Sequence, residues 1–259
     1  MEEGRKLKIL VIAPTPFFSD RGTHIRILEE ALALERRGHE VKIATYHIGK
    51  DLPESLGSRI DVRRIRRLLF WYKKLEAGPD WQKILLDIML IRKSFYLART
   101  WQPDIIHGHL HEGALIGWLV EKALFWRRMK LVADFHGSLT REMVSHAYLR
   151  AVGLQRIFAA IERWIDDLGD AAVASSWDNA EEISTIRTKS SAIPIIDGTR
   201  LGMFIGVSDR GALRKKYGIP EEKVLVSYTG ALIPNKGIKL FLEAVPLICE
   251  RFPDVHFLI

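Results

Sequence analysis

The chain has 259 residues, of which 47% are hydrophobic and 27% charged, a composition that excludes a disordered or collagen-like protein. Its single cysteine, Cys249, permits neither an internal disulfide nor a zinc site built from cysteines, so we expect a reducing compartment. The formal charge of +7, from 39 Lys and Arg against 32 Asp and Glu, favours an anionic partner such as nucleic acid, phospholipid or a phosphorylated substrate.

The chain opens with a strand–helix–strand pattern. Residues 8–13 form an apolar run typical of a buried parallel strand, and a loop over 14–22 follows it. Apolar residues then recur at helical spacing, with Thr23 as the expected N-cap and Gly38 as the C-terminal stop. Residues 41–44 are the next predicted strand. Parallel strands need such a crossover, so this segment predicts one βαβ unit.

The alternation of short apolar strands and helical segments continues to about residue 196. Further strands are predicted at 60–65, 104–107, 131–135, 171–174 and 193–196, and helices at 81–100, 113–127 and 154–167. The pattern indicates an α/β fold with a doubly wound parallel sheet covered on both faces. Ligands of such sheets bind at the carboxyl ends of the strands, so the loops there are where we expect the chemistry.

A loop-rich joint at 197–204 separates this part from a second strand–helix–strand pattern. There we predict a short helix at 208–217, strands at 224–229 and 255–259, and a helix at 238–252. We therefore divide the chain into an N-terminal Rossmann-like domain, residues 1–205, and an incomplete second domain, residues 206–259. The second stretch is too short for an independent parallel α/β sheet. We expect the two domains to form separate sheets.

The loop before the first helix is a candidate phosphate site. Backbone N–H groups and the dipole at a helix start attract phosphate, and Gly22 lets a ligand approach the backbone closely. A plain turn is the alternative interpretation of a single glycine. The chain contains neither a G-x-G-x-x-G nor a P-loop sequence, which disfavours a nicotinamide dehydrogenase or an ATPase.

Histidines follow two of the predicted strands. His107, His109 and His111 alternate, and on a strand they would share one face, where imidazoles can hold zinc or copper. We predict instead that the strand ends near His107 and that these are polar loop residues at the mouth of the crevice, with no metal bound. His136 directly follows the strand 131–135, where a ligand-facing imidazole is expected. A structural histidine is the alternative interpretation.

Lys236 and Gly237 precede the predicted helix of the second strand–helix–strand pattern. An ammonium group there would meet a phosphate at the helix start, and an ordinary surface lysine is the alternative. No Asp-x-Asp sequence is present, so a metal-held nucleotide diphosphate has no obvious pair of ligands.

A basic stretch with interleaved aromatic side chains lies at 59–74. Seven Lys and Arg residues stand against one acid, Asp61, with aromatic residues at 70–72 among them. The pattern favours contact with an anionic membrane surface over nucleic acid, and a solvated face beside core residues is the alternative. Apolar runs such as 114–120 are far shorter than the ~20 residues of a spanning helix. We therefore expect a cytoplasmic protein, peripheral at the inner face of the membrane.

Short segments with a characteristic order and spacing run through the chain. They are Lys8-Ile-Leu-Val-Ile-Ala13, the loop at Gly22, Arg37-Gly-His-Glu-Val41, Pro103-Asp-Ile-Ile-His107, Phe135-His-Gly137, Asp197-Gly198 with Phe204, Tyr228-Thr-Gly230 and Pro234-Asn-Lys-Gly237. Together they resemble the retaining, nucleotide-sugar-dependent glycosyltransferases of family 4. The resemblance covers nearly all of the chain and implies the two-domain GT-B fold and transfer of a sugar from a nucleotide-sugar donor to a glycan or lipid acceptor.

The resemblance also implies roles for single residues. His136 would contact the transferred sugar near the reaction centre, and Lys236 would neutralise the donor diphosphate in place of a metal ion. The other residues it implies are Gly22, Thr23 and Gly230 on the donor side and Arg21, His107 and His109 on the acceptor side. No metal and no cofactor is expected, because the nucleotide sugar is a substrate.

Two departures from the family pattern keep other functions open. Ala231 stands where family members usually carry an arginine, so a second cationic contact to the diphosphate is absent or supplied elsewhere. The family's glutamate-bearing segment and its closing helix lie beyond Ile259, so we expect these 259 residues alone to have no substantial transferase activity. The alternatives are a non-catalytic partner subunit or pseudoenzyme and a GT-B sugar epimerase.

Overall fold

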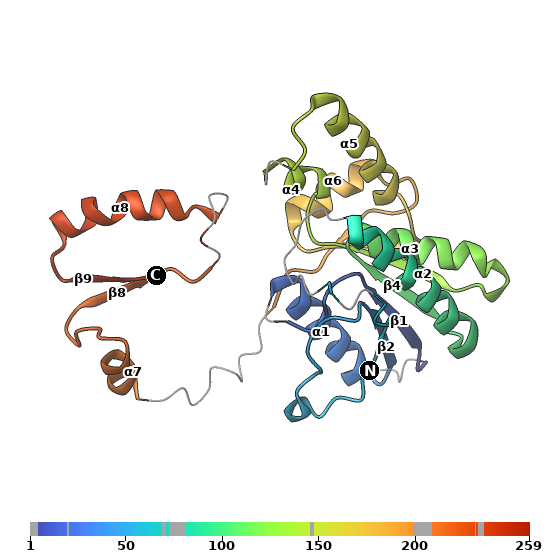
Figure 1. Cartoon of the computed structure of the whole chain (residues 1–259), viewed down its shortest axis with the longest axis horizontal. Helices are drawn as coiled ribbons and strands as arrows, with labels where there is room; N and C mark the ends of the chain where they lie inside the picture. The colour runs from blue at the N-terminus through green and yellow to red at the C-terminus, as the bar shows by residue number, and fades with distance from the viewer. Residues whose placement is uncertain are drawn as a thin grey trace. The chain divides into compact units, whose positions relative to one another are not determined.

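The computed structural model describes residues 5–19, 21–68, 71–72, 81–145, 148–198, 209–230, 232 and 236–259. The chain divides into two compact units, Met1–Gly198 and Thr199–Ile259, and both can be followed in Figure 1. The boundary predicted between 205 and 206 lies in 199–208, outside the described residues. Each unit is described by itself.

The N-terminal unit contains a seven-stranded parallel sheet in the order β3-β2-β1-β4-β5-β6-β7. Its strands are β1 (Lys8–Ala13), β2 (Glu40–Thr45), β3 (Asp61–Arg64), β4 (Ile105–His109), β5 (Lys130–Phe135), β6 (Ala171–Ala174) and β7 (Ile193–Pro194). The chain runs outward from β1 to β3 and then returns to place β4 beside β1. This is the doubly wound parallel sheet that the sequence predicts.

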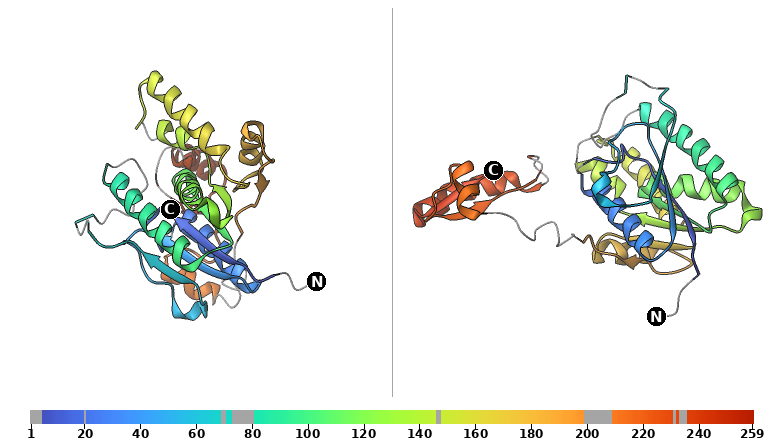
Figure 2. Two further views of the ribbon diagram at one scale, coloured as in Figure 1. Left: turned by 90° about the vertical axis from the view of Figure 1, so that its right-hand side faces the viewer. Right: turned by 90° about the horizontal axis from the view of Figure 1, so that it is seen from below.

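Helices cover both faces of this sheet (Figure 2). They are α1 (Gly22–Arg36), α2 (Trp81–Trp101), α3 (Leu110–Ala123), α4 (Leu139–Ser145), α5 (Val152–Asp166) and α6 (Trp177–Ile186), with short 3₁₀ turns η1 (Glu54–Leu56) and η2 (Phe125–Arg127). Successive side chains of β1 point to opposite faces. Leu10 packs in the cluster that includes Leu90 of α2, whereas Val11 packs with Ile27 of α1.

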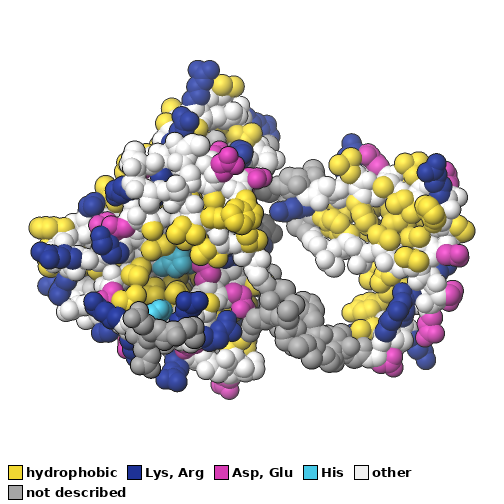
Figure 3. Space-filling model, turned by 180° about the vertical axis from the view of Figure 1, so that it is seen from behind, with side chains coloured by type: hydrophobic (Ala, Val, Ile, Leu, Met, Phe, Trp, Pro, Cys, Tyr) yellow, Lys and Arg dark blue, Asp and Glu magenta, His cyan; other side chains and the backbone are white. Residues whose placement is uncertain are grey.

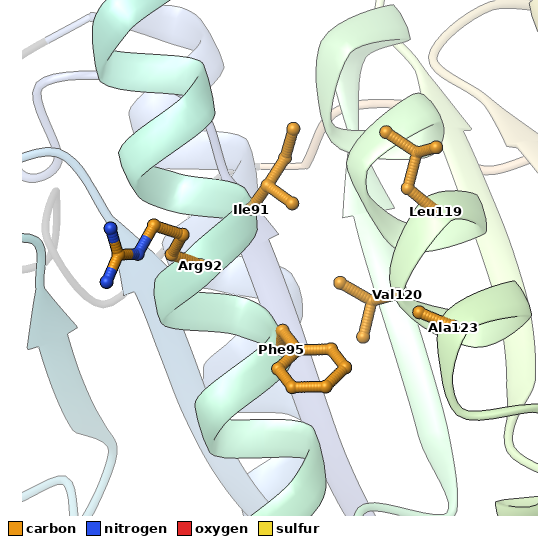
Figure 4. A pocket seen from close by; sticks show the side chains of 6 residues that line it. All are labelled: Ile91, Arg92, Phe95, Leu119, Val120 and Ala123. Atoms are coloured by element: carbon orange, nitrogen blue, oxygen red, sulfur yellow. The ribbon is translucent and has the colours of Figure 1, made fainter.

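Helices α2 and α3 pack against each other on one face of the sheet. A hollow of about 310 Å³ between them is lined by Ile91, Arg92, Phe95, Leu119, Val120 and Ala123. In Figure 4 Ile91 and Phe95 face α3, whereas Arg92 points away from it. None of the predicted site residues lines this hollow, so we interpret it as part of the helix packing.

The second unit contains α7 (Arg210–Lys216), β8 (Val224–Ser227), α8 (Ile238–Arg251) and β9 (Val255–Leu258). The strands β8 and β9 pair in parallel and form a two-stranded sheet of their own. The prediction of two separate sheets is therefore confirmed. Within the described residues, no helix combines the length and the apolar character needed to cross a membrane.

The structure corrects several local predictions. Thr23 is not the N-cap of α1, because that helix begins at Gly22 after Arg21, which makes no side-chain capping bond. Strand β4 does not end near His107 but continues to His109, which pairs with Asp134 of β5. Helices α4 and α6 were not predicted from the sequence. Ser176, the N-cap of α6, is a sequence signal for the start of this helix, because its side chain accepts a hydrogen bond from the Asn179 amide at 3.2 Å.

Candidate active site

The predicted site residues of the N-terminal unit lie where the strand order reverses, between β1 and β4. Open α/β sheets bind their ligands at such a point, outside the carboxyl ends of the strands. The loop after β1 leads to Arg21, Gly22 and Thr23, β4 ends at His109, and His136 directly follows β5. The face drawn in Figure 3 exposes only small areas of histidine, in keeping with the burial of most of these imidazoles.

Asp134 carries a buried carboxylate that several neighbouring side chains contact. Its side chain is 0% exposed, and its carboxylate accepts hydrogen bonds from Nε and Nη2 of Arg26 at 3.2 and 3.0 Å. The Nδ1 atom of His109 lies 3.0 Å from Asp134 Oδ2. A two-point guanidinium–carboxylate contact fixes both groups in orientation as well as in charge.

The pairing of β4 with β5 brings the histidines to Asp134. His109 is the direct partner of Asp134 in the parallel ladder, and His107, two residues earlier, points to the same face. The two imidazole rings lie with their centroids 4.3 Å apart. His109 is only 1% exposed at its side chain, so we assign it to positioning Asp134 and His136 rather than to direct contact with an acceptor.

His136 sits at the edge of this cluster, one step beyond the end of β5. Its Nε2 atom lies 3.6 Å from Asp134 Oδ2 and 3.2 Å from His109 Nδ1. Gly137 follows with φ of 144°, a backbone conformation that side-chain-bearing residues rarely adopt, and it turns the chain sharply after the imidazole. His136 is therefore held from the protein side at a position where the strand opens toward ligand.

Burial sets the protonation states of the cluster. It lowers the pKa of His107 to about 3 and lowers the pKa of His109. Burial also acts to raise the pKa of Asp134, but the hydrogen bonds from His109 and His136 outweigh it and hold that pKa well below its usual range. At neutral pH the site thus combines a charged carboxylate with neutral imidazoles at 107 and 109.

Besides Asp134, Arg26 links α1 to the segment that follows β7. Its Nη1 atom donates to the carbonyl of Ile195 at 2.7 Å and to Asp197 Oδ1 at 2.7 Å, and its Nη2 atom lies 2.8 Å from Glu30 Oε1. The guanidinium thereby joins α1, β5 and the segment after β7. This buried cation balances the charge of Asp134, which would be costly to bury alone.

The start of α1 provides an open helix N-terminus beside these groups. A Cβ at Gly22 would meet no atom within 4 Å, so the backbone there is accessible, as the phosphate-site prediction requires. His24, in the first turn, is buried and its Nδ1 atom lies 2.6 Å from the hydroxyl of Ser19. Burial lowers the pKa of His24 to about 4, and the charges of Arg21 and His136 add to the effect.

The second unit carries the other two predicted residues. Gly230 follows β8, and Lys236 lies just before α8, whose N-cap Gly237 has φ of 76°. The side chain of Lys236 is exposed, next to a helix N-terminus that attracts anions. Ala231 lies outside the described residues.

Glu30, His107, His109 and Asp134 lie close enough to be considered as metal ligands. The guanidinium of Arg26 already occupies both oxygens of Asp134 and supplies the positive charge that a metal would bring. This cluster therefore fits a buried ion pair with histidines around it better than a metal centre.

Sequence reasoning missed Arg26, Glu30 and Asp134. A signal for Asp134 was available, because an acid inside the apolar run 131–135 is costly unless it is paired. A cation inside the apolar face of the first helix, Arg26, was the complementary signal.

The fold and the site define a class of protein. A doubly wound parallel sheet with an open helix N-terminus and a histidine at its strand-reversal point is typical of α/β ligand-binding units, and here a second unit with its own two-stranded parallel sheet follows it in the chain. The model of the family described as Glycosyltransferase Family 4 matches residues 21–197 of this chain. The chain belongs to this family.

Curated relatives carry the same kind of name. The chain is 23% identical over 249 residues to the D-inositol 3-phosphate glycosyltransferase of Actinosynnema mirum, covering 91% of this chain and 56% of that protein. It is 25% identical over 279 residues to the protein of the same name from Mycolicibacterium paratuberculosis, covering 100% of this chain and 58% of the relative. The chain thus spans little more than half the length of these relatives.

Solved structures share the fold. The sucrose-phosphate synthase of Thermosynechococcus elongatus matches with a TM-score of 0.69 at 16% identity, over 97% of this chain and 61% of that one. A UDP-GlcNAc 2-epimerase from Neisseria meningitidis bound to UDP-GlcNAc matches with a TM-score of 0.59 at 12% identity, over 97% and 64%. These likenesses confirm the predicted GT-B fold.

We expect the stability of the N-terminal unit to fall as the pH drops from about 6.5 toward 3, and His107 to be one cause. The unfolded chain protonates this imidazole near its ordinary pKa, whereas the folded chain does so only at about 3. Between these values the unfolded state binds more protons, which costs up to about 1.4 kcal/mol per pH unit. Urea unfolding at a series of pH values is the measurement. In the His107→Gln variant the free energy of unfolding should fall less steeply as the pH drops. An unchanged slope in that variant would contradict the lowered pKa of His107 as a cause.

Proposed function

We propose that this chain forms the acceptor-side domain and the start of the donor domain of a retaining glycosyltransferase that takes its sugar from a nucleotide-sugar donor. The observation that carries the proposal is His136, held by Asp134 and His109 at the strand-reversal point, beside the open N-terminus of α1. The printed names of the relatives support a glycosyltransferase. A glycan or a lipid-linked glycan is the acceptor that we propose.

The Nε2 atom of His136 contacts Asp134 and His109, and we propose that the other ring nitrogen, Nδ1, hydrogen-bonds a hydroxyl of the transferred sugar. Asp134 and His109 fix the ring, and a fixed polar group stabilises a transition state without reorganising. Arg21, Gly22 and Thr23 lie on the same side of the sheet and would line the approach of acceptor and donor. His107 is buried beneath and supports His109.

Lys236 is the proposed contact for the leaving diphosphate. Its exposed ammonium group next to the N-terminus of α8 is the arrangement that favours a phosphate. We propose that Gly230, which follows β8, also lies on the donor side. We propose that the transfer step uses no metal ion and no cofactor, because the ammonium group of Lys236 neutralises the negative charge of the leaving diphosphate.

Lys236→Ala should therefore lower kcat/KM for the nucleotide-sugar donor by about 100-fold, the effect of removing one group that stabilises developing charge. Lys239→Ala, which removes an exposed lysine in the first turn of α8, is the matched control and should stay within about twofold. Release of nucleoside diphosphate by the product of the full gene is the measurement. Equal rates for the two variants would count against the diphosphate contact.

The Asp134–His136 arrangement favours this function over a non-catalytic partner subunit, which has no need of a buried ion pair beneath an imidazole at the sheet edge. A sugar epimerase remains the second candidate, since an epimerase shares the fold. The fate of the sugar separates the two enzymes: it moves to an acceptor in one case and stays on the nucleotide in the other.

We also propose that the protein works in the cytoplasm, at the inner face of the membrane, and that part of the 59–74 stretch contacts anionic lipid. Some cations of this stretch are already engaged within the protein. Arg64 is committed to the protein, donating to the carbonyls of Phe17, Ile48 and Lys50, and Arg63 pairs with Asp61 at 2.7 Å. Residues 69–70 and 73–74 lie outside the described residues.

The exposed remainder includes Arg66 and Arg67 together with Leu68 and Trp71, which are 64% and 54% exposed. Replacing Arg66 and Arg67 by Ser should weaken binding to anionic vesicles by about 2 kcal/mol, at about 1 kcal/mol per cation, or roughly 30-fold. Replacing Arg36 and Arg37, which are also exposed, by Ser is the matched control. Vesicle sedimentation is the measurement, and equal binding to neutral and anionic vesicles would contradict the proposal.

A further inference from the structure

A second cluster of ligating side chains, separate from the ion pair of Asp134 and Arg26, brings together residues of α3 and α5. Glu162 and Asp166 are four residues apart on α5 and therefore share one face of that helix. His111, in the first turn of α3, reaches both: its Nε2 atom is 3.5 Å from Glu162 Oε1 and 3.2 Å from Asp166 Oδ1. All three residues are buried, with 5 to 8% exposure.

Three arginines lie close to this cluster: Arg141 and Arg163 line the same pocket, and Arg187 bonds to the backbone of Asp166. Two carboxylates face one imidazole, and His111 is the partner of both in the described ion pairs. Glu162 accepts the backbone N–H groups of Leu139 and Thr140 at 2.7 and 3.0 Å. The Oδ1 atom of Asp166 is buried and makes no well-aligned hydrogen bond among the described residues, although His111 Nε2 lies 3.2 Å away. Arg187 donates to the backbone carbonyl of Asp166 and not to its side chain. A buried carboxylate oxygen in this state is costly.

The two separations measured from His111 fit neighbouring ligands of a tetrahedral metal site, and all three ligand atoms lie within 4.8 Å of one another. With metal–ligand distances of about 2.0 to 2.1 Å, neighbouring ligands of tetrahedral zinc lie about 3.3 Å apart, and the separations from His111 Nε2 are 3.2 and 3.5 Å. A pocket of about 310 Å³, lined by all three residues and by Ser138 and Thr140, leaves room for a fourth ligand such as water. We propose that His111, Glu162 and Asp166 bind a divalent transition-metal ion of the Zn²⁺ type.

The ion would join α3 and α5 to the loop that follows His136. Glu162 already holds the amides of Leu139 and Thr140 at the start of α4, where that loop ends, so fixing Glu162 also fixes the chain shortly after the candidate catalytic imidazole. This role is structural, and it stands apart from the transfer chemistry. It departs from the expectation, drawn from the sequence, that no metal is bound.

The test is titration of the metal-stripped 259-residue chain with Zn²⁺ by calorimetry, and with Co²⁺ by visible absorption. We expect one ion per chain and a Co²⁺ spectrum typical of tetrahedral coordination. Asp166→Asn should weaken Zn²⁺ binding by more than about 100-fold, the upper end of the effect of removing a residue that only supports a ligand. Asp167→Asn, the same change one residue along in a side chain bonded to Thr188, should bind as the wild type does.

Circular dichroism shows whether each variant folds, and His111→Gln replaces Asp166→Asn if the latter does not. Absence of stoichiometric Zn²⁺ binding to the wild-type chain would overturn the proposal. So would undiminished affinity in both variants, or loss of binding in His107→Gln with full binding in Asp166→Asn, because that result places the ion at Asp134. None of these outcomes depends on transferase activity.

Discussion

Asp134→Asn is expected to destabilise the N-terminal unit by about 3–5 kcal/mol, the cost of breaking a buried ion pair by removing one partner. The substitution leaves the guanidinium of Arg26, whose side chain is only 3% exposed, without its buried counter-charge. It also removes the negative charge that His109 and His136 face. Urea unfolding followed by tryptophan fluorescence measures the effect in the right unit, because all seven tryptophans lie within residues 71–177.

Asp170→Asn is the matched control for this experiment. Asp170 also accepts a backbone hydrogen bond, from Leu131 at 2.9 Å, and pairs with Lys130, but it lies at the surface end of β5 and is partly exposed. Its loss should cost about 1 kcal/mol. If Asp134→Asn costs no more than Asp170→Asn, the Asp134–Arg26 pair is not the centre of the buried region.

His136→Ala is expected to lower the turnover of the proposed transferase by about 100- to 1,000-fold, the range typical of a positioned polar catalytic group. KM for the donor should change little, because Lys236 and the other donor-side groups are untouched. The fold should also persist, since the imidazole lies at the rim of the cluster and Asp134 keeps its bonds to Arg26.

Initial rates with the product of the full gene measure this effect, and His39→Ala provides the comparison. His39 accepts a hydrogen bond from the Leu7 amide at 3.4 Å at the opposite, amino end of the strands, so its loss should leave turnover within about twofold. A wild-type rate in His136→Ala would remove this residue from the reaction centre.

The parallel sheet could be predicted because its evidence is local. Strands β1, β4 and β5 include short apolar runs that are followed in the chain by helical periodicity, so the alternation indicates crossovers. Strand β3 (Asp61–Arg64) is mostly charged, and α6 after β6 was not predicted. The position of His136 at a strand end follows from the same pattern, since the residue after an apolar strand lies at the ligand edge of such a sheet.

The partners of His136 could not be predicted in the same way. Arg26 and Asp134 are 108 residues apart in sequence, and their contact depends on which strands are neighbours and in which register. His109 meets Asp134 because those two residues are paired across β4 and β5, a register that neither strand specifies by itself. If the strand ended near His107, as the sequence predicts, His109 would lie outside the sheet, and its contact with Asp134 would not be foreseen.

The measurement that tests the proposed function most directly follows the fate of a radiolabelled sugar. The product of the full gene is incubated with a panel of labelled nucleotide sugars and with glycan and lipid acceptors, and the labelled products are separated. We predict label on an acceptor, one nucleoside diphosphate released per sugar moved, and loss of this transfer in His136→Ala. Label that stays on the nucleotide as an isomerised sugar, or transfer that persists in His136→Ala, would contradict it.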